Sequence, residues 1–226
     1  MTQTLPFADP AAIALAGRLL ADHEIIAAPT DTVYGLFAHF DQPIALEKLY
    51  DVKGRPPQKA IPVLIGEFAQ LAQLTPLPLS PLARYLAERF WPGALTLVIP
   101  ALPTLPPLLT AGQPTVGVRM PDHALLCTLL RQTGPLAATS ANRSGQPESH
   151  DAEGVLAQLD GQLPLLLAEP AQALPLAQPP STVVDLTDPA GHIRILRSGV
   201  FASAVEAAAA TFMPSSTKND GRPTTA

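Results

Sequence analysis

Short apolar runs of the kind that form buried strands alternate with segments of helical periodicity along most of this chain. The first helical segment covers Pro10–Asp22, where Asp9 is a good N-cap and Pro10 suits the first helical position. A strand-like apolar run follows at Glu24–Ala28. Strands that alternate with helices are typical of an α/β fold, and runs this apolar indicate a sheet that is covered on both faces.

The same patterns continue towards the C-terminus. Further helices are expected at 43–51, 67–74, 81–90, 122–132, 151–159 and 202–211. Further strands are expected at 60–66, 94–100, 115–121, 135–141, 163–168, 181–186 and 192–197. Consecutive strands in the middle and near the end interrupt the alternation, so we expect a mixed, mostly buried sheet and not a regular doubly wound one.

The length of 226 residues allows one domain with a substantial core. We expect this domain at 1–212, because residues 213–226 are polar and aperiodic and indicate a disordered tail. The chain holds 27 prolines, which are dense at 102–107 and 164–180. These two segments read as long loops, since patterned segments continue on both sides of each.

Several features favour a cytoplasmic protein. No apolar run approaches the roughly 20 residues that a membrane helix needs, and the N-terminus lacks a basic start and an apolar segment typical of a secretory signal. The single cysteine, Cys127, excludes an internal disulfide and a cysteine-based zinc site. It lies in an apolar helical run, where we expect a buried structural thiol.

The formal net charge of −5 argues against a strongly basic surface for nucleic acid. Of the 14 lysines and arginines, seven lie in or beside loops rich in Gly, Pro, Ser and Thr: Lys53, Arg55, Lys59, Arg119, Arg143, Arg194 and Arg197. This placement at strand ends indicates a local anion site on an acidic protein, although solvated loop residues would give the same pattern.

Missing motifs narrow the chemistry further. The sequence contains no G-x-G-x-x-G after a strand, no G-x-x-x-x-G-K-[ST], no H-E-x-x-H and no G-x-S-x-G. The one S-x-x-K, at 215–218, lies in the polar tail, and the five histidines show no metal-ligand spacing. A P-loop, a standard dinucleotide fold and common hydrolase sites are therefore not expected.

Polar residues gather in the stretch "APTDTVYGL" at 28–36, directly after the first apolar strand. Two hydroxyls, a carboxylate, a phenol and a glycine are more than a turn needs. Thr30 and Thr32 are ligand candidates, whereas Gly35 is expected to permit a turn. Asp31 either orders the loop or contacts substrate.

Four other constellations are rich in groups that bind anions. Lys53 and Arg55, with Lys59 close by, form either a phosphate clamp or cations that favour the end of a helix. Arg119 closes a strand before a proline, from where it can reach a carboxylate or phosphate. The other two groups comprise Thr139, Ser140 and Asn142 after one strand, and Ser181, Arg194 and Arg197 around the last two.

These constellations lack a nucleophile with an adjacent base. The segment at 138–149 can hold an anion or a base edge, or can simply cap the next helix. Taken together, the groups suit binding and activation of phosphates and carboxylates better than hydrolysis.

Seven motifs occur in an order that resembles a known family. They are "PTDTVYGL", "KGRP", "WPGALTLV", "VGVRMPDH", "ATSANRSG", "STVVD" and "ILRSG", and they extend over about 9–200. In this respect the chain is similar to the YrdC-like threonylcarbamoyl-AMP synthases. The resemblance implies a single α/β domain with a twisted, mixed or mostly parallel sheet flanked by helices around a concave cavity.

The resemblance also implies a reaction and its partners. L-threonine, bicarbonate and ATP would give threonylcarbamoyl-AMP and pyrophosphate, with Mg²⁺ accompanying ATP and no organic cofactor. The product would feed threonylcarbamoyladenosine formation in tRNA by downstream modification proteins, and weak tRNA binding is compatible with it. No membrane partner is implied.

Site residues carry over by motif. The resemblance implies contacts to threonine for Thr30, Thr32, Arg119, Thr139 and Ser181. It implies a catalytic role for Lys53 and Arg55, and contacts to ATP for Lys53, Arg55, Lys59, Ser140, Asn142, Arg194 and Arg197. No protein side chain is assigned to a metal.

The sequence departs from the family pattern before Ser181. A glycine-rich segment with an acidic residue is usual there, whereas 168–180 carry prolines and no glycine. Two alternatives stay open: a YrdC-like module that binds RNA or nucleotide without catalysis, and a related carbamoyl-transfer enzyme such as those of hydrogenase maturation.

Overall fold

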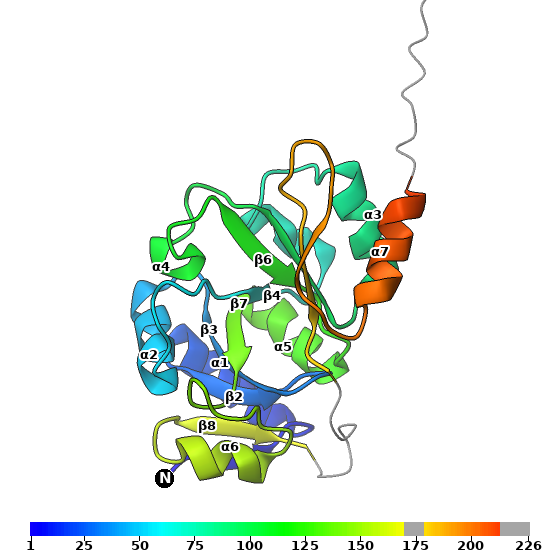
Figure 1. Ribbon diagram of the computed structural model, residues 1–226. Helices are drawn as coiled ribbons and strands as arrows, with labels where there is room; N and C mark the ends of the chain where they lie inside the picture. Colours follow the sequence, from blue (N-terminus) through cyan, green and yellow to red (C-terminus); the bar gives the residue numbers. More distant parts are fainter. Residues whose placement is uncertain (170–178, 213–226) are drawn as a thin grey trace, which may run out of the picture.

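The computed structural model describes residues 1–169 and 179–212, which form a mixed sheet with helices around it (Figure 1). The strands are β1 (Gln3–Pro6), β2 (Ile26–Pro29), β3 (Tyr34–His39), β4 (Val63–Leu64), β5 (Leu95–Pro100), β6 (Thr115–Arg119), β7 (Leu136–Ser140), β8 (Leu165–Ala168), β9 (Thr182–Asp185) and β10 (Arg194–Arg197). The helices are α1 (Pro10–Ala21), α2 (Pro43–Lys53), η1 (Phe68–Gln73), α3 (Pro81–Phe90), α4 (Pro107–Thr110), α5 (Ala124–Thr133), α6 (Ala152–Leu159) and α7 (Ala202–Thr211). The predicted tail at 213–226 and most of the proline-rich loop at 164–180 lie outside the described residues.

The sheet runs in the order β1-β8-β2-β3-β7-β4-β6-β5-β9-β10. Four neighbouring pairs are parallel and five are antiparallel. The predicted α/β fold with a mixed sheet is confirmed. The expectation of a mostly parallel sheet is wrong, because five pairs are antiparallel: β2-β3, β3-β7, β4-β7, β5-β6 and β9-β10.

One central strand departs from the sequence prediction. The segment Tyr34–His39, which we expected to begin as a loop, forms β3 between β2 and β7. Gly35 lies within this strand, where a Cβ atom would approach the Phe37 ring to 2.9 Å. The glycine therefore permits close packing and not a turn, and the turn itself is confined to residues 30–33.

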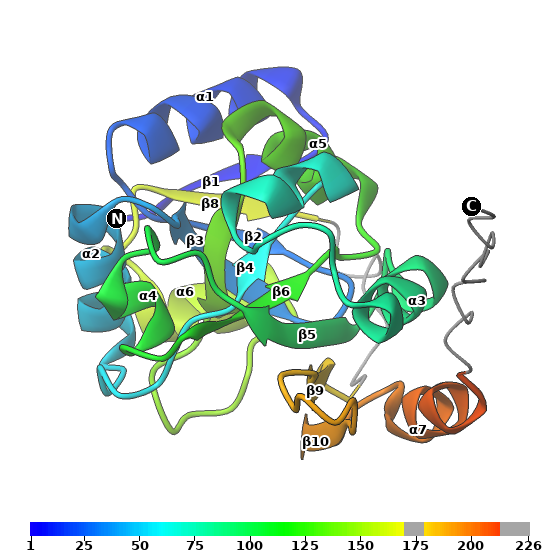
Figure 2. The ribbon, with the colours of Figure 1, turned by 90° about the horizontal axis from the view of Figure 1, so that it is seen from above.

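The two faces of the sheet bury separate clusters of apolar side chains. The smaller cluster lies under α1 and α5 and includes Leu20, Phe37 and Leu165, and Figure 2 shows both helices on this side of β1 and β8. The larger cluster lies on the opposite face and includes Leu46 of α2 and Leu86 of α3. Burial of both faces explains why the strand sequences are apolar throughout.

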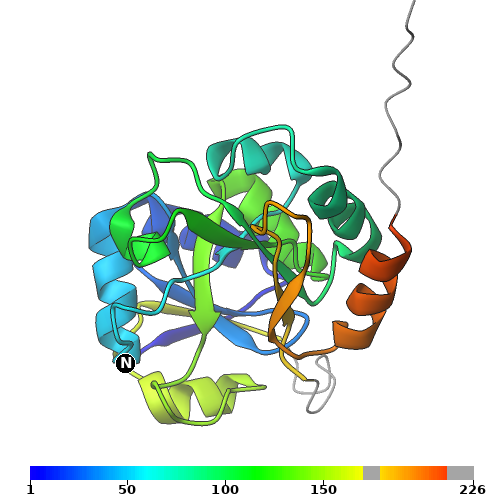
Figure 3. The ribbon, with the colours of Figure 1, turned by 45° about the horizontal axis from the view of Figure 1, so that its top comes forward.

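The second half of the sheet has one covered face and one hollow face. In β5, Leu95, Leu97 and Ile99 belong to the larger cluster, whereas Thr96 and Val98 line a cavity on the other side. Helices α1 and α5 do not extend over this part, and the sheet bends so that β9 and β10 stand across from β7 (Figure 3). The cavity is therefore a consequence of curvature and of the alternation of side chains along each strand.

Two smaller predictions are confirmed. Asp9 caps α1 by accepting a hydrogen bond from the Ala11 amide at 2.8 Å. Cys127 is buried in α5, its thiol donates to the Pro121 carbonyl at 3.2 Å, and burial raises the pKa of the thiol. Within 1–169 and 179–212, none of the helices has the length and apolar character to cross a bilayer.

Candidate functional site

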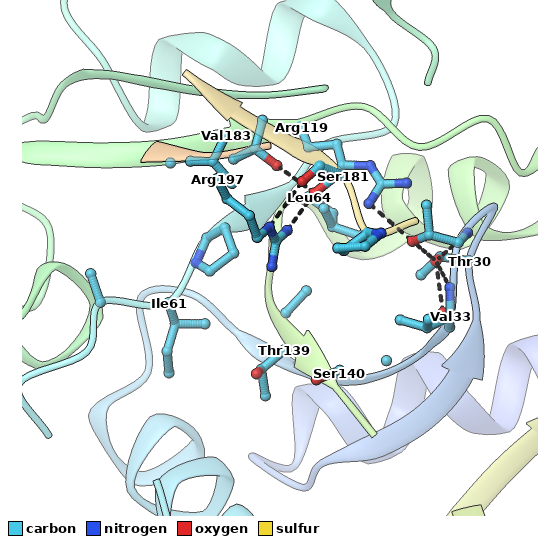
Figure 4. Close-up of a pocket in the computed structure, with 18 of the residues that line it drawn as sticks. Thr30, Val33, Ile61, Leu64, Arg119, Thr139, Ser140, Ser181, Val183 and Arg197 are labelled. Atoms are coloured by element: carbon cyan, nitrogen blue, oxygen red, sulfur yellow. Dashed lines mark hydrogen bonds between the residues drawn. The ribbon is translucent and has the colours of Figure 1, made fainter. Parts of the chain in front are cut away.

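A cavity of about 450 Å³ lies on the hollow face of the sheet, between β3 and β7 on one side and β9 and β10 on the other. Eight of the predicted site residues line it: Thr30, Thr32, Arg55, Arg119, Thr139, Ser140, Ser181 and Arg197. Four others are not among its lining residues: Lys53, Lys59, Asn142 and Arg194. Figure 4 shows Arg197 and Ser181 across the cavity from Thr139 and Ser140, with Thr30 and Val33 on a third side.

The turn between β2 and β3 is organised by one hydroxyl. Thr30 Oγ1 donates to the Val33 carbonyl at 2.7 Å and accepts from the Thr32 and Val33 amides at 3.0 and 3.2 Å. The Thr32 hydroxyl lies 3.1 Å from it. Thr30 thus fixes the turn, and Thr32 is held at the cavity wall.

Arg119 ends β6 and points towards this turn (Figure 4). Its Nε donates to the Gly93 carbonyl at 3.0 Å, Nη1 to Thr32 Oγ1 at 3.3 Å, and Nη2 forms an ion pair with the Asp31 carboxylate. Burial lowers the pKa of the guanidinium, and the charge of Asp31 opposes this shift. The question about Asp31 is thereby answered: it is the counter-ion of Arg119, so an incoming carboxylate would share the guanidinium with it.

Lys53 is buried at the C-terminus of α2, and its amine is surrounded by oxygen atoms of the segment after β7. Its Nζ lies 2.6 Å from the Ser140 carbonyl and 3.2 Å from Ser140 Oγ, and 3.0 Å from both the carbonyl and Oδ1 of Asn142. Burial, with Arg55 adding to it and Glu148 opposing it, lowers the pKa of Lys53 to about 8. Lys53 therefore clamps α2 to the loop that carries the cavity hydroxyls.

Arg55 follows the left-handed cap residue Gly54 and lines the cavity. Its Nε donates to the Lys59 carbonyl at 3.1 Å and its Nη2 to the Ala60 carbonyl at 2.7 Å. The side chain of Lys59 is exposed. The guanidinium of Arg55 thus holds the backbone of the loop at 55–60. Of Arg55 and Lys59, only Arg55 lines the cavity.

Ser181 and Arg197 form the opposite wall. Arg197 Nε donates to the Ser181 carbonyl at 2.9 Å and Nη2 to Ser181 Oγ at 2.8 Å, and Thr96 Oγ1 lies 3.2 Å from the same hydroxyl. Burial lowers the pKa of Arg197, while the negative charge of Glu148 opposes the shift. The last two strands therefore hold a cation and a hydroxyl together at the cavity.

Arg194 takes a different position, although it lies only three residues before Arg197. Its Nη2 pairs with Asp185 Oδ2 at 2.7 Å, and its side chain is 74% exposed. The register places Arg194 opposite Asp185 and Arg197 opposite Val183, with a bulge between 195 and 197. The two arginines therefore differ in their position along the hairpin, and only Arg197 lies next to Ser181.

The different positions of Arg194 and Arg197 lead to a prediction that compares two variants. If the cavity takes ATP, as the family resemblance implies, Arg197→Ala is expected to raise the apparent KM for ATP about 10- to 100-fold, because charge-assisted hydrogen bonds are lost. Arg194→Ala is expected to change it by less than about twofold, since exposed ion pairs contribute little. Steady-state pyrophosphate release at varied ATP measures both, and equal effects would contradict the predicted contact of Arg197 with ATP.

Two sets of lining residues were not identified from sequence. One is an apolar wall: Ile61, Pro62, Val98, Val183 and Leu196. The other is Glu148, a carboxylate from the loop after β7. The alternation in β5 and β9 could have indicated the apolar wall, whereas the sequence around Glu148 reads as an ordinary polar loop.

The cavity is electropositive. Arg55, Arg119 and Arg197 line it against one carboxylate, Glu148. In the parts of the chain that the structure describes, no three His, Cys, Asp or Glu side chains gather as they would to hold a metal ion. Three arginines with hydroxyls around them form a site for anionic groups such as phosphates and carboxylates.

An α/β domain with such a cavity is of a class suited to bind phosphorylated or carboxylated small molecules. The chain belongs to the Sua5/YciO/YrdC family, whose profile carries the description "Telomere recombination" and matches residues 18–199. The expected membership among YrdC-like proteins is thereby confirmed.

Individual relatives agree with this assignment. The chain is 47% identical over 165 residues to a threonylcarbamoyl-AMP synthase of Bacillus subtilis. The aligned region covers 72% of this chain and 47% of that protein. It is 37% identical over 205 residues to a putative threonylcarbamoyl-AMP synthase of Mycobacterium tuberculosis, covering 88% of this chain and 91% of the other.

A solved structure shows the same fold. Pyrococcus abyssi Sua5 in complex with L-threonine superposes with a TM-score of 0.77 at 35% identity, over 83% of this chain and 54% of that one. The chain thus spans about half the length of the Bacillus and Pyrococcus proteins.

Proposed function

We propose that this protein is an L-threonylcarbamoyladenylate synthase, a nucleotidyltransferase of the cytoplasm that acts in tRNA modification. It would convert L-threonine, bicarbonate and ATP into threonylcarbamoyl-AMP and pyrophosphate. The observation that carries the proposal is a single cavity in which Arg119 and the Thr30 turn lie near Arg55, Ser140 and Arg197. Relatives named for this activity support it.

The amino acid would occupy the part of the cavity next to Arg119. The guanidinium has N–H groups beyond those used by Gly93, Thr32 and Asp31, and can donate to a carboxylate. The Pyrococcus relative was solved with L-threonine, which supports an amino-acid site in this fold. The hydroxyls of Thr32, Thr139 and Ser181 would complete the contacts.

The triphosphate would occupy the part lined by Arg55, Ser140 and Arg197. Both arginines present planar guanidinium groups suited to phosphate oxygens. Lys53 would act behind this wall, since its amine holds the Ser140 and Asn142 segment. Direct ATP contacts of Lys59 and Asn142 stay predictions, whereas the proposal gives no such contact to Arg194, whose exposed side chain pairs with Asp185 away from the cavity lining.

The chemistry needs positioning and charge stabilisation. The threonine amine and bicarbonate form a carbamate with loss of water, and a carbamate oxygen attacks the α-phosphorus of ATP while the bond to pyrophosphate breaks. Arg55 and Arg197 would stabilise the charge that develops on the phosphates. Mg²⁺ supplied with ATP would neutralise phosphate charge, held chiefly by the phosphates themselves and water.

Pyrophosphate release tests the proposal directly. We expect release from ATP to require bicarbonate and to be strongest with L-threonine among a panel that includes serine, valine and alanine. A phosphate-coupled assay measures the rate, and mass spectrometry identifies the adenylate. Release that is indifferent to threonine would contradict the proposal, and salt-dependent RNA binding without release would favour the non-catalytic alternative.

A further inference from the structure

Two hydrogen bonds join the segment 198–201, which connects β10 to α7, to the start of β9. The Val200 amide donates to the Pro180 carbonyl at 3.3 Å, and the Phe201 amide donates to Thr182 Oγ1 at 2.9 Å. We call residues 198–201 the β10–α7 junction, and none of the roles considered so far uses it. The junction contacts the chain on either side of a residue that lines the cavity.

That residue is Ser181, and Gly199 of the junction lies against its backbone. A Cβ atom at position 199 would come within 2.1 Å of the Pro180 carbonyl oxygen, 2.6 Å of the Thr182 amide nitrogen and 2.7 Å of the Ser181 carbonyl carbon. Gly199 does not have a positive φ. Glycine is therefore needed here for space and not for its backbone conformation.

A side chain at position 199 would displace the wall that Ser181 and Arg197 form. All three close atoms belong to the backbone, so rotation of a side chain cannot relieve the contact. Because Cβ atoms do not approach other heavy atoms within 3.0 Å, an alanine would separate the junction from Pro180 by about 1 Å. The Arg197 hydrogen bonds to Ser181, at 2.8 and 2.9 Å, do not tolerate such a shift, since bonds of this kind extend only to about 3.2 Å.

The same junction reaches the part of the cavity that holds Arg119. The Phe201 ring lies over Gly93, where a Cβ atom would approach ring Cε2 to 3.1 Å, and the Gly93 carbonyl accepts from Arg119 Nε at 3.0 Å. Burial lowers the pKa of Arg119 and the positive charge of Arg197 adds to the shift, so the two guanidinium groups lie close enough to interact. One short segment thus contacts the backbone groups that hold both arginines.

We propose that Gly199 is a positioning residue for the reaction, because it lets the β10–α7 junction close on β9 and so sets Ser181 and Arg197 at the cavity. The inference rests on the proposed function, since it assigns these side chains to substrates that have to meet. A misplacement of about 1 Å, even one that begins far from the reacting atoms, can cost about 100-fold in rate. The missing methyl group of Gly199 therefore matters for catalysis although it touches no substrate.

The experiment compares Gly199 with Gly191, the glycine of the turn before β10. Gly191 has a φ of +78° and no atom within 4 Å of an added Cβ, so Gly191→Ala strains the backbone without displacing a neighbour. We expect Gly199→Ala to lower kcat/KM for ATP in pyrophosphate release about 100-fold. We expect Gly191→Ala to lower the melting temperature but to change kcat/KM by less than about twofold, because its strain is local.

A spectroscopic signal reports the wall itself in the protein without substrates. The Nε–H resonance of Arg197, identified by its absence from the spectrum of Arg197→Ala, senses the hydrogen bond to the Ser181 carbonyl. We expect this resonance to move in Gly199→Ala and to stay in place in Gly191→Ala.

A second variant loosens the junction without inserting an atom. Thr182→Val removes the acceptor of the Phe201 amide at nearly constant volume, at a fully buried position. We expect it to move the Arg197 resonance and to lower kcat/KM about 3- to 10-fold. It tests the junction even if Gly199→Ala does not fold.

Several outcomes would overturn the inference. An unchanged resonance with unchanged kcat/KM in Gly199→Ala, or in Thr182→Val if the first variant does not fold, overturns it. Equal losses in the two glycine variants overturn it as well, because general destabilisation then explains both. A resonance that moves without loss of kcat/KM shows a contact that the reaction does not use. Wild-type protein that releases no pyrophosphate overturns the proposed function, and the resonance then still shows whether Gly199 sets the position of Arg197.

Discussion

Lys53→Ala is expected to slow pyrophosphate release at least about 100-fold, because small displacements of positioning groups have effects of this size on rate. Its amine holds four oxygen atoms of Ser140 and Asn142, and these residues carry the wall of the cavity. Without it, two buried carbonyl groups lose their donor. We also expect a lower free energy of unfolding, by about 2–4 kcal/mol, since an unsatisfied buried acceptor costs roughly 1–3 kcal/mol.

Two further variants show whether the effect is specific to the amine of Lys53. Lys48→Ala removes a lysine of the same helix that pairs with Glu24 at the surface and should leave both rate and stability near wild type. Lys53→Met keeps much of the volume but supplies no donor, so it should lose rate as the alanine variant does. A normal rate in Lys53→Met would remove Lys53 from the catalytic machinery.

The pH dependence separates the clamp from a purely structural lysine. The pKa of Lys53 is lowered to about 8, so the folded protein loses this proton above about pH 8 while the unfolded chain keeps it to a higher pH. This group's contribution to stability therefore rises with pH above 8. The rate should fall over the same range, because a neutral amine has fewer hydrogens for four acceptors, and this limb should be absent in Lys53→Met.

Strong local patterns predicted the fold well, and weak ones did not. Helix α1 begins where Asp9 and Pro10 predicted it, because capping is a local interaction. Strand β3 was missed, because the polar stretch before it obscured a run whose burial depends on β2 and β7. The predicted strand at 60–66 contains only β4, two residues long, because pairing with β6 and β7 sets its length.

The candidate site was predictable in its residue types and not in its contacts. Arg119, Ser181 and Arg197 stand in short motifs that sequence alone brings to attention, and the structure gathers them at one cavity. The contact of Lys53 with Ser140 spans 87 residues and depends on how α2 meets β7, which no local pattern contains. Glu148 has no motif at all, since a single acid in a polar loop resembles any solvated residue.

Arg119→Ala is expected to weaken L-threonine binding at least about 100-fold, while ATP binding changes by less than about fivefold. A buried guanidinium that pairs with a ligand carboxylate contributes on this scale when it is truncated. Calorimetric titration of each ligand into the variant measures both constants. The difference between them, and not the loss alone, locates Arg119 at the amino acid.

The Asp31 ion pair complicates the single variant and also supplies its control. Removing Arg119 leaves a buried carboxylate without a partner, which can lower the free energy of unfolding by about 3–5 kcal/mol. The double variant Arg119→Met/Asp31→Asn removes both charges, so we expect it to recover much of that stability and still fail to bind threonine. Asp31→Asn alone frees the guanidinium from its competitor and should keep threonine binding despite a lower melting temperature. Equal loss of threonine and ATP binding in the stable double variant would show that Arg119 supports the whole cavity and does not select the amino acid.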